Sequence, residues 1–383
     1  MKFEAYISKL NKAIYVQDQH RLADLLQVRS ITALSACEDA IRTRADVKHR
    51  IPKVIRGPWA DVIVSHCECI KARLGRDCVE ACTRQISTVT DLYGLACEAD
   101  DYLRRIGDKT GRLEESARVV NRAFSTCIND SNFESPRETS RQQGTYFLVG
   151  LLFQIYFRLD TKHLCKNVLR VLSKVNIADL KYYPRPHQIK FKYYEGRYEF
   201  YNGNFTKAGE YLEYALQRCH KSYPTNKQRI LAFLIPTRLY QGILPMQALL
   251  ERYPALGAVY QPLVTAIKTG NIKLFDERLA QHEHLLLRQG TYLALEQARN
   301  IAIRTLFKKV YLVLGKTTRL QFHQFQAALK FVGMAIESAE VECMLAAMIY
   351  KGYIRGYLSH EHQTLVLSKN GPFPSLGSVL RSN

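Results

Sequence analysis

The sequence of 383 residues lacks an apolar segment long enough to span a membrane. Its longest nearly unbroken apolar run, residues 147–157, is interrupted by Gln154 and falls short of the roughly 20 residues that a membrane-spanning helix needs. We interpret this run as a core helix. The N-terminal segment "MKFEAYISKLNKAIY" alternates charged and apolar residues and lacks the apolar core of a secretory signal, so we expect a protein of the cytosol or nucleus.

Acidic residues are scarce, with 35 Asp and Glu against 55 Lys and Arg, a net charge of +20. This imbalance favours an acidic partner, whether RNA, DNA, an anionic membrane or an acidic protein, and does not choose among them. At 47% hydrophobic residues, the chain is globular and long enough for two or three domains.

Catalytic and nucleotide-binding motifs are also missing. The segment "YLVLGKTT" resembles a phosphate-binding loop, but that loop needs a glycine five residues before Gly315, where Val310 stands. No Gly-x-Gly-x-x-Gly, serine-nucleophile elbow or paired-cysteine redox motif occurs. We therefore expect no enzyme, no catalytic residue and no cofactor.

The ten cysteines are expected to be free thiols in a reducing compartment. One group has the residue types of a zinc site: His66, Cys67, Cys69, Cys78 and Cys82. Structural zinc sites favour two closely spaced pairs, whereas Cys78 and Cys82 would share the apolar face of a helix. We favour buried thiols over zinc and predict no metal site. The two His-Glu-His triplets lack the spacing of a helical zinc site.

Helical hairpins dominate residues 3–300 in this interpretation. In "YYEGRYEFYNGNFTKAGEYLEYALQRCHKSYP" two helices meet at Asn202-Gly203-Asn204, Gly196 allows close contact, and Phe205, Ala208, Leu212 and Ala215 form the packing stripe. A second copy is predicted around Gly270-Asn271, with Ala266, Ile267, Phe275 and Leu279. Fainter copies start at residues 13 and 156. Such hairpins must stack to bury their faces, which predicts a right-handed tetratricopeptide-like solenoid.

The pattern changes at about residue 301. A helix ending at Gly315, a second in "TRLQFHQFQAALKFVG" and a third in "SAEVECMLAAMIYKG", with Ser338 as N-cap, precede a predicted β-hairpin. In its first strand Ile354 and Leu358 face inward and Tyr353, Arg355 and Tyr357 outward. In its second strand Leu365 and Leu367 face inward, and "HEHQ" forms the turn. Three helices closed by a hairpin predict a winged helix.

A helical solenoid followed by a winged helix resembles the PCI domain shared by subunits of the proteasome lid, the signalosome and translation initiation factor three. The segments "LFKKVYLVL", "AEVECMLAAMIYKGYIRGYLSHEHQTLVLSK" and "NGPFP", with "HLCKNVLR", "KYYEGR" and "NKQRILAFLIPTRL" upstream, resemble the Thp/PCI-domain-containing-protein-two family of the nuclear transcription-and-export complex. They also resemble the twelfth signalosome subunit of fungi. This resemblance covers about residues 145–376 and is weaker in residues 1–140.

The resemblance implies a mainly α PCI fold and a subunit that assembles with a GANP-type scaffold and a small acidic DSS/Sem-type protein. It also implies joint binding of RNA or DNA during messenger RNA export, a nuclear location that includes the nuclear pore, and some cytoplasmic protein. We expect a hetero-oligomer without membrane contact. The alternative is a signalosome- or lid-type scaffold subunit without nucleic-acid contact. The corresponding domains are residues 1–140 and 141–300 (helical repeats), 301–370 (winged helix) and 371–383 (tail).

Basic residues of the winged helix are the candidate nucleic-acid contacts, because residues 301–383 hold ten Lys or Arg and four Asp or Glu. The candidates are Arg304, Lys308, Lys309, Arg319, Lys351 and Arg355. The alternative is a solvated basic face. Glu340 and Glu342 open the third helix and would be repelled by phosphate, so base readout by that helix is not expected. Charge-based binding to single strands is expected instead, with Tyr353 and Tyr357 either stacking on bases or packing.

The second strand, residues 364–368, is a candidate free edge, and an edge must be paired or protected. We therefore expect it to meet the scaffold subunit, unless the tail "KNGPFPSLGS" folds over it. The candidate partner-binding residues are Tyr353, Tyr357, Thr364, Val366 and Ser368.

Overall fold

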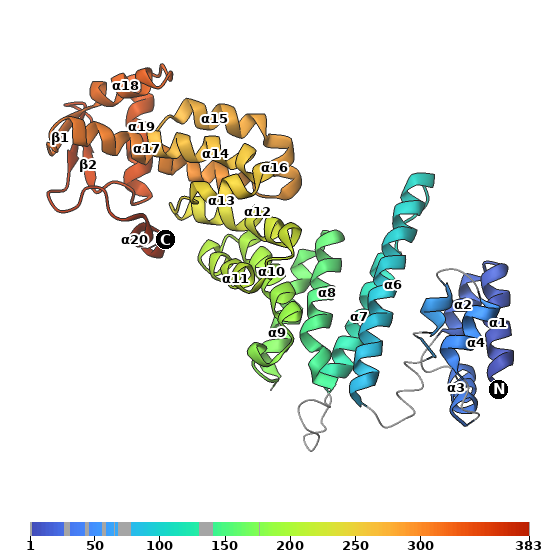
Figure 1. Cartoon of the computed structure of the whole chain (residues 1–383). Coiled ribbons are helices and arrows are strands. Elements are labelled where there is room, and N and C mark those ends of the chain that lie inside the picture. Colours follow the sequence, from blue (N-terminus) through green and yellow to red (C-terminus); the bar gives the residue numbers. More distant parts are fainter. Residues whose placement is uncertain are drawn as a thin grey trace. The chain divides into compact units, whose positions relative to one another are not determined.

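The computed structural model describes residues 2–26, 31–42, 46–55, 59–64, 66–67, 78–129, 141–175 and 177–382. Within these ranges the chain is mainly helical, as the sequence predicts, and its strands lie near the C-terminus (Figure 1). The chain divides into two compact units, Met1–Tyr194 and Glu195–Asn383.

Helices at the start of the first unit surround a hydrophobic core of their own. They are α1 Phe3–Tyr15, α2 Gln19–Leu25, α3 Ile31–Arg42 and α4 Val47–Val54. Helix α1 buries Tyr6 and Leu10, which lie one turn apart, and the Asp18 carboxylate caps α2 by accepting a hydrogen bond from the backbone N–H of Arg21. The packed pair α1 and α2 confirms the faint hairpin predicted from residue 13.

Longer helices make up the rest of the first unit. They are α6 Cys78–Ile106, α7 Arg112–Ile128, η1 Arg141–Gly144, α8 Thr145–Arg158, η2 Lys162–Leu164, α9 Cys165–Lys174, η3 Leu180–Tyr182 and α10 Arg185–Tyr201, which continues into the second unit. Helix α8 contains the apolar run and buries Leu151, Leu152 and Ile155, which confirms a core helix. Throughout the described ranges, every helix is too short or too polar to cross a membrane.

The second unit begins with the predicted hairpin at Asn202-Gly203-Asn204, where α10 gives way to α11 Phe205–Arg218. Gly203 has a φ of 79°, a left-handed conformation that glycine adopts without strain. A Cβ atom added to Gly196 would lie 2.8 Å from Cγ of Leu212, so glycine is what lets α10 and α11 approach closely. The buried stripe of α11 comprises Ala208, Leu212 and Ala215.

Further helices lead to the second predicted hairpin. They are α12 Pro224–Tyr240, α13 Gln247–Arg252, α14 Pro254–Thr269, α15 Ile272–Gln281 and α16 Glu283–Gln289. Gly270 ends α14 with a φ of 74°, and the Asn271 side chain caps α15 by accepting a hydrogen bond of 3.0 Å from the backbone N–H of Leu274. The hairpin is confirmed, with Phe275 and Leu279 buried as predicted.

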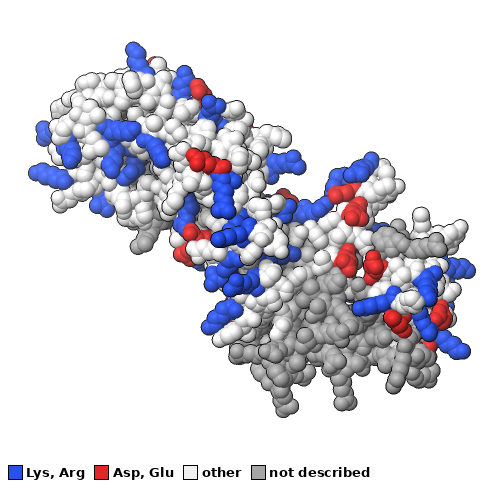
Figure 2. Space-filling model, viewed as in Figure 1, with Lys and Arg blue, Asp and Glu red and all other residues white. Residues whose placement is uncertain are grey.

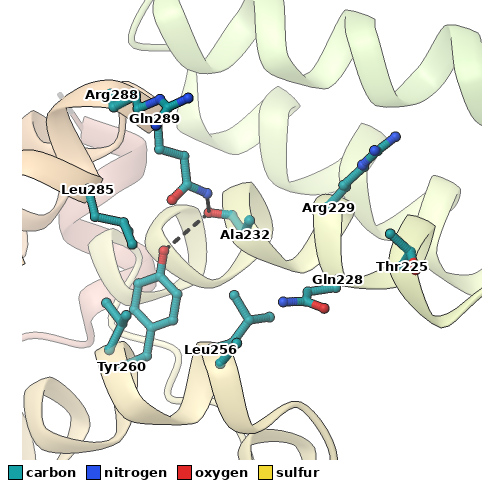
Figure 3. A pocket seen from close by; sticks show the side chains of 11 residues that line it. Thr225, Gln228, Arg229, Ala232, Leu256, Tyr260, Leu285, Arg288 and Gln289 are labelled. Carbon is teal, nitrogen blue, oxygen red and sulfur yellow. Dashed lines mark hydrogen bonds between the residues drawn. The ribbon is translucent and has the colours of Figure 1, made fainter.

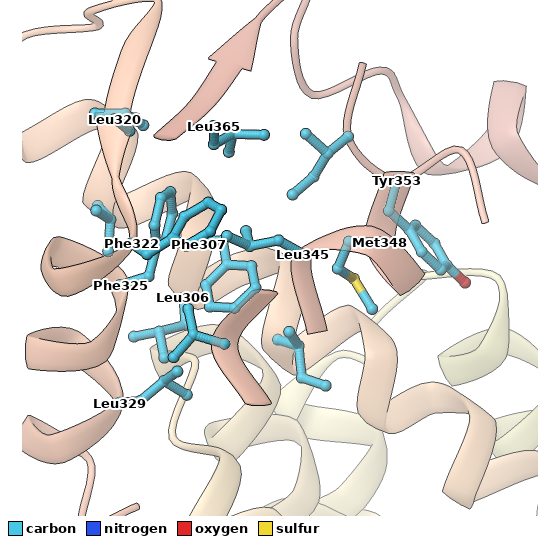
Figure 4. Packing of buried hydrophobic residues seen from close by; sticks show 14 of the residues in the cluster. Leu306, Phe307, Leu320, Phe322, Phe325, Leu329, Leu345, Met348, Tyr353 and Leu365 are labelled. Atoms are coloured by element: carbon cyan, nitrogen blue, oxygen red, sulfur yellow. The ribbon is translucent and has the colours of Figure 1, made fainter. Parts of the chain in front are cut away.

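The C-terminal part is a winged helix. Its elements are α17 Tyr292–Val313, β1 Arg319–Gln321, α18 Phe322–Phe331, α19 Ser338–Tyr350, β2 Gly356–Ser359, β3 Thr364–Leu367 and, beyond the wing, α20 Leu376–Ser382. Figure 4 shows the core, in which the rings of Phe307 and Phe325 meet edge to face at 5.0 Å. Leu365 and Leu367 of β3 are buried in this core, which confirms the wing as its cover.

The sheet differs from the predicted two-stranded hairpin. Strand β1, which the sequence pattern assigned to a helical segment, pairs with β3, so the strand order is β1-β3-β2. Strand β3 is therefore the central strand, and the predicted free edge at residues 364–368 is wrong. A three-residue strand such as β1 is too short to show an alternating sequence pattern. Its pairing partner lies more than 40 residues later, so no local pattern reports the contact.

Helix α17 joins the winged helix to the last hairpin. It runs unbroken from Tyr292 to Val313, so the predicted boundary between residues 300 and 301 falls inside a continuous helix. A Cβ atom added to Gly270 would lie 2.8 Å from the backbone nitrogen of Leu306 on α17. The hairpin of α14 and α15 therefore packs backbone to backbone against the winged helix.

Candidate nucleic-acid interface

The outer face of the sheet gathers three candidate residues in one row. Arg319 of β1 pairs with Val366 of β3, which in turn pairs with Tyr357 of β2. Directly paired residues project from the same face of a sheet, and their neighbours Leu320 and Leu365 face the core. Arg319 is exposed, and 64% of Tyr357 is exposed. The row therefore presents an arginine and an aromatic ring to solvent.

Arg355 extends this row. The backbone N–H of Ser368 donates a hydrogen bond of 2.9 Å to the carbonyl oxygen of Arg355, which places Arg355 opposite Ser368, two residues before Tyr357 and on the same side of the sheet. Its side chain is exposed. We call the surface formed by Arg319, Arg355, Tyr357 and Val366 the outer wing face. Two arginines beside an exposed ring suit a phosphodiester chain with stacked bases.

The predicted lysines are exposed but do not form one surface. Lys309 donates a hydrogen bond of 2.8 Å from Nζ to the carbonyl oxygen of Thr269, at the end of α14. Lys351 donates one of 3.3 Å to Oδ1 of Asn300. Asn300 and Lys309 lie half a turn apart around the axis of α17, so Lys309 and Lys351 are on different sides of this helix. Lys308 is exposed beside Lys309 and has no place in the row.

Acidic residues of the winged helix gather at the turn end of the hairpin. They are Glu337, Glu340, Glu342 and Glu361. Oε1 of Glu342 lies 2.9 Å from Nδ1 of His360, and the Ser338 hydroxyl donates to Oε1 of Gln363 at 2.9 Å. Ser338 begins α19 without capping it, because Glu337 holds the N-cap position. This acidic end disfavours insertion of α19 into a groove of DNA. On the side of the winged helix that Figure 2 shows, Lys and Arg outnumber Asp and Glu.

Arg304 lies outside this surface, and its predicted role is corrected. It is only 8% exposed, and its Nη2 donates hydrogen bonds of 2.6 and 3.4 Å to the carbonyl oxygens of Pro374 and Phe373. Burial lowers the pKa of the guanidinium. Helical spacing placed Arg304 off the apolar stripe, but the C-terminal tail folds back over that side of α17. Arg304 therefore holds the tail and cannot reach a phosphate.

Two predicted partner-binding residues are also corrected. Tyr353 is 5% exposed and lies in the core beside Ile354, because it follows the turn at Gly352 and precedes β2. Thr364 is 7% exposed in the central strand. Neither side chain is available to a partner, whereas Val366 and Tyr357 remain on the outer wing face. The tail contacts the start of β2, where Pro372 accepts a hydrogen bond from Arg355, rather than covering β3.

The candidate zinc residues lie only partly within the described residues. His66 and Cys67 are buried, while Cys69 and the side chains of Cys78 and Cys82 lie outside the described residues. Across the part of the chain that the structure describes, no three His, Cys, Asp or Glu residues are grouped so that they could hold a metal ion.

A hollow of about 560 Å³ opens between α12, α14 and α16 (Figure 3). The Tyr260 hydroxyl and Nε2 of Gln289 both donate to the carbonyl oxygen of Ala232, at 3.2 and 3.1 Å. Burial raises the pKa of Tyr260 and keeps its hydroxyl protonated. Arg229 and Arg288 are exposed at the edge. The apolar lining comes from Ala255, Leu256, Val259 and Leu285.

We call this hollow the basic groove. Its lining contains two arginines and no carboxylate, so it suits an acidic peptide that also carries an apolar side chain. Sequence reasoning did not identify it, because its residues come from three helices with no shared local pattern. No local sequence signal marks the groove, because the 50% exposure of Leu285, three residues before Arg288, is known only from the structure.

Comparison with known proteins fits this architecture. Residues 279–369 match the family model described as PCI domain. The chain is 33% identical to PCI domain-containing protein 2 of Xenopus laevis over 98% of each chain. It is 44% identical to the protein CSN12 homolog of Schizosaccharomyces pombe, over 70% of this chain and 63% of that protein. It is 41% identical to the CSN12 homolog of Mycosarcoma maydis, over 70% and 62%.

The alignment thus spans less than two thirds of the length of these two fungal relatives. The frog relative, in contrast, is matched almost from end to end. Together with the C-terminal PCI domain, that match shows that this chain is a PCI-domain protein and belongs to the family of PCI domain-containing protein 2 and the CSN12 homologs.

Proposed function

We propose that the chain is a non-enzymatic PCI subunit of a nuclear messenger-RNA-export complex, in which its outer wing face binds RNA or DNA. In this proposal it assembles with a GANP-type scaffold and a small acidic DSS/Sem-type protein, in the nucleus and at the nuclear pore. The observation that supports the proposal most strongly is the placement of Arg319, Arg355 and Tyr357 on one exposed face.

Binding at this face is a matter of charge and stacking. Neighbouring strands lie about 4.8 Å apart, so Arg319 on β1 and the chain entering β2 at Arg355 are separated by about 10 Å across the sheet. Long arginine side chains at that separation reach different phosphates of one strand. Tyr357 offers its ring to a base between them. Because this mode reads no base edges, we expect weak sequence preference and strong salt dependence.

In this proposal the scaffold subunit contacts β2, not β3 as the sequence pattern predicted. Strand β3 is paired on both sides, so the sheet can pair with another chain only at β1 or β2. We place the contact at β2 because its edge is longer, with four residues against three in β1. The tail already contacts the start of β2 through Pro372, which leaves the turn-proximal half of the strand for the scaffold.

The acidic partner is assigned to the basic groove. Arg229 and Arg288 supply the charge that attracts carboxylates, and Leu256 and Leu285 supply apolar surface for an anchoring side chain. A disordered acidic chain that binds there would gain structure only on contact.

The alternative function is a scaffold subunit of a signalosome- or lid-type complex without nucleic-acid contact, and the names of the CSN12 homologs favour it. Purification of the tagged chain from nuclear extract, followed by identification of the proteins bound to it, separates the two. The export proposal predicts a larger PCI scaffold and a small acidic protein. Recovery of signalosome or lid subunits instead would sink it.

A further inference from the structure

Helix α9 in the first unit carries a line of exposed cations. Lys166, Arg170 and Lys174 follow one another at intervals of four residues, and all three side chains are exposed. Four helical residues rise about 6 Å, so the three charges lie along one side of the helix over about 12 Å. The opposite side of α9 is held in the core by Cys165 and Val168.

This line has no acidic counterpart. No Asp or Glu occurs between residues 161 and 178, and within the described ranges none of the three cations is in an ion pair. Other surface cations of this unit do have such partners: Arg104 and Arg158 both contact Asp101. Helix α7 shows the usual arrangement, because Glu114 precedes Arg118 by four residues.

The arrangement is unfavourable for the isolated helix. Lys166 and Arg170, like Arg170 and Lys174, are like charges at i, i+4, which destabilise a helix. Lys166 also stands in the first turn, where the helix dipole repels a cation, whereas Lys174 in the last turn is favoured by the dipole. Helix α9 spans only ten residues, a length at which intrinsic helix stability is marginal. A polyanion laid along this side would relieve these repulsions.

We propose that the exposed side of α9 is a binding site for the phosphodiester backbone of single-stranded nucleic acid. A nucleic-acid strand carries one charge per nucleotide at regular intervals, which suits cations repeated at each turn. Asn167 is exposed beside them. Its Oδ1 accepts a hydrogen bond of 3.1 Å from Nη2 of Arg170, and its amide N–H groups are of the kind that donate to phosphate oxygens. The site lies on the first unit and does not depend on binding at the outer wing face.

The test uses the full chain, poly-uridylate as probe, and two double variants with the same loss of charge. One is Lys166→Gln with Arg170→Gln. The control is Arg118→Gln with Arg122→Gln, an exposed i, i+4 pair on α7 in the same unit. We expect the α9 variant to lose affinity on the order of 10-fold at physiological salt. The slope of log affinity against log salt concentration should become shallower by about 1.4, because each of the two lost phosphate contacts contributes roughly 0.7. We expect the control to bind like the unsubstituted chain.

Two further measurements separate specific binding of nucleic acid from loss of folding and from attraction to any polyanion. The α9 variant should unfold at the same temperature as the unsubstituted chain or at a higher one, because it loses repulsions and no buried group. Poly-glutamate should compete poorly with poly-uridylate. Equal losses in both double variants, or poly-glutamate competing as well as the nucleic acid, would overturn the proposal. A double variant with Arg319→Gln and Arg355→Gln, assayed in parallel, reports on the outer wing face alone. The proposal for α9 and the proposal for the outer wing face can therefore be refuted independently.

Discussion

Arg304 donates a hydrogen bond of 2.6 Å from Nη2 to the carbonyl oxygen of Pro374 and so joins helix α17 to the C-terminal tail. The substitution Arg304→Ala should lower the free energy of unfolding by about 2 kcal/mol, because it removes charge-assisted hydrogen bonds and leaves carbonyls unpaired. Denaturation in urea measures this, with exposed Lys308→Ala as a control that should stay within about 0.5 kcal/mol. If Arg304→Ala weakened RNA binding without loss of stability, the assignment of Arg304 to the tail would be wrong.

Gly270 should be more sensitive to substitution than Gly315, a turn glycine of the second unit with the same φ. Gly270→Ala and Gly315→Ala both place alanine at a φ of 74°, which costs about 1 kcal/mol in the left-handed region. The new Cβ at Gly270 would also lie 2.8 Å from the backbone of Leu306, whereas nothing lies within 4 Å at Gly315.

We therefore expect Gly270→Ala to lower the free energy of unfolding by about 3 kcal/mol, once the steric conflict is added, and Gly315→Ala by about 1 kcal/mol. Urea denaturation of the two variants checks this. Equal losses would mean that the hairpin does not pack backbone to backbone against α17.

Because His66 is buried, we expect the folding stability of the first unit to fall at acidic pH. Burial lowers the pKa of His66 to about 4, and its Nε2 has no hydrogen-bond partner among the described residues. The unfolded chain has a histidine pKa of about 6.5, so it binds the proton more readily than the folded chain does. Stability is therefore complete above about pH 6.5 and is lost as the pH falls toward 4, by about 3 kcal/mol in total.

Urea denaturation followed across this pH range checks the His66 prediction. His66→Phe removes the titrating group and should flatten the profile between about pH 6.5 and 4. Parallel profiles for the two proteins would show that other groups cause the acid sensitivity.

The basic groove predicts a charge-reversal effect on the acidic partner. Arg229→Glu with Arg288→Glu should weaken binding of the small acidic protein on the order of 10-fold or more, because each reversal replaces attraction by repulsion. Arg252→Glu with Lys268→Glu changes the charge equally at exposed sites outside the groove. Calorimetric titration should therefore separate the two variants, and similar affinities would place the partner elsewhere.

Much of the fold was predictable because its signals are local. Gly203 and Gly270 mark turns that need positive φ, and Leu365 and Leu367 alternate toward the core as the strand period requires. Patterns of this kind are visible within a few residues. They led to the hairpins, the wing and the family.

The errors concern contacts between residues far apart in the chain. Arg304 is buried because a tail some 70 residues later folds over it, and Thr364 is central because β1 pairs with its strand. No spacing within either segment reports these contacts. Among the candidate residues, Arg319, Arg355 and Tyr357 lie on one exposed face, whereas Arg304 and Tyr353 are buried.

The central claim is that the outer wing face binds single-stranded nucleic acid through its arginines. Its most direct test is titration of poly-uridylate onto the chain at several salt concentrations, with and without Arg319→Gln and Arg355→Gln. We expect the variant to lose affinity on the order of 10-fold and its salt slope to fall by about 1.4. An unchanged affinity and an unchanged slope would contradict the claim and leave the scaffold function as the better account.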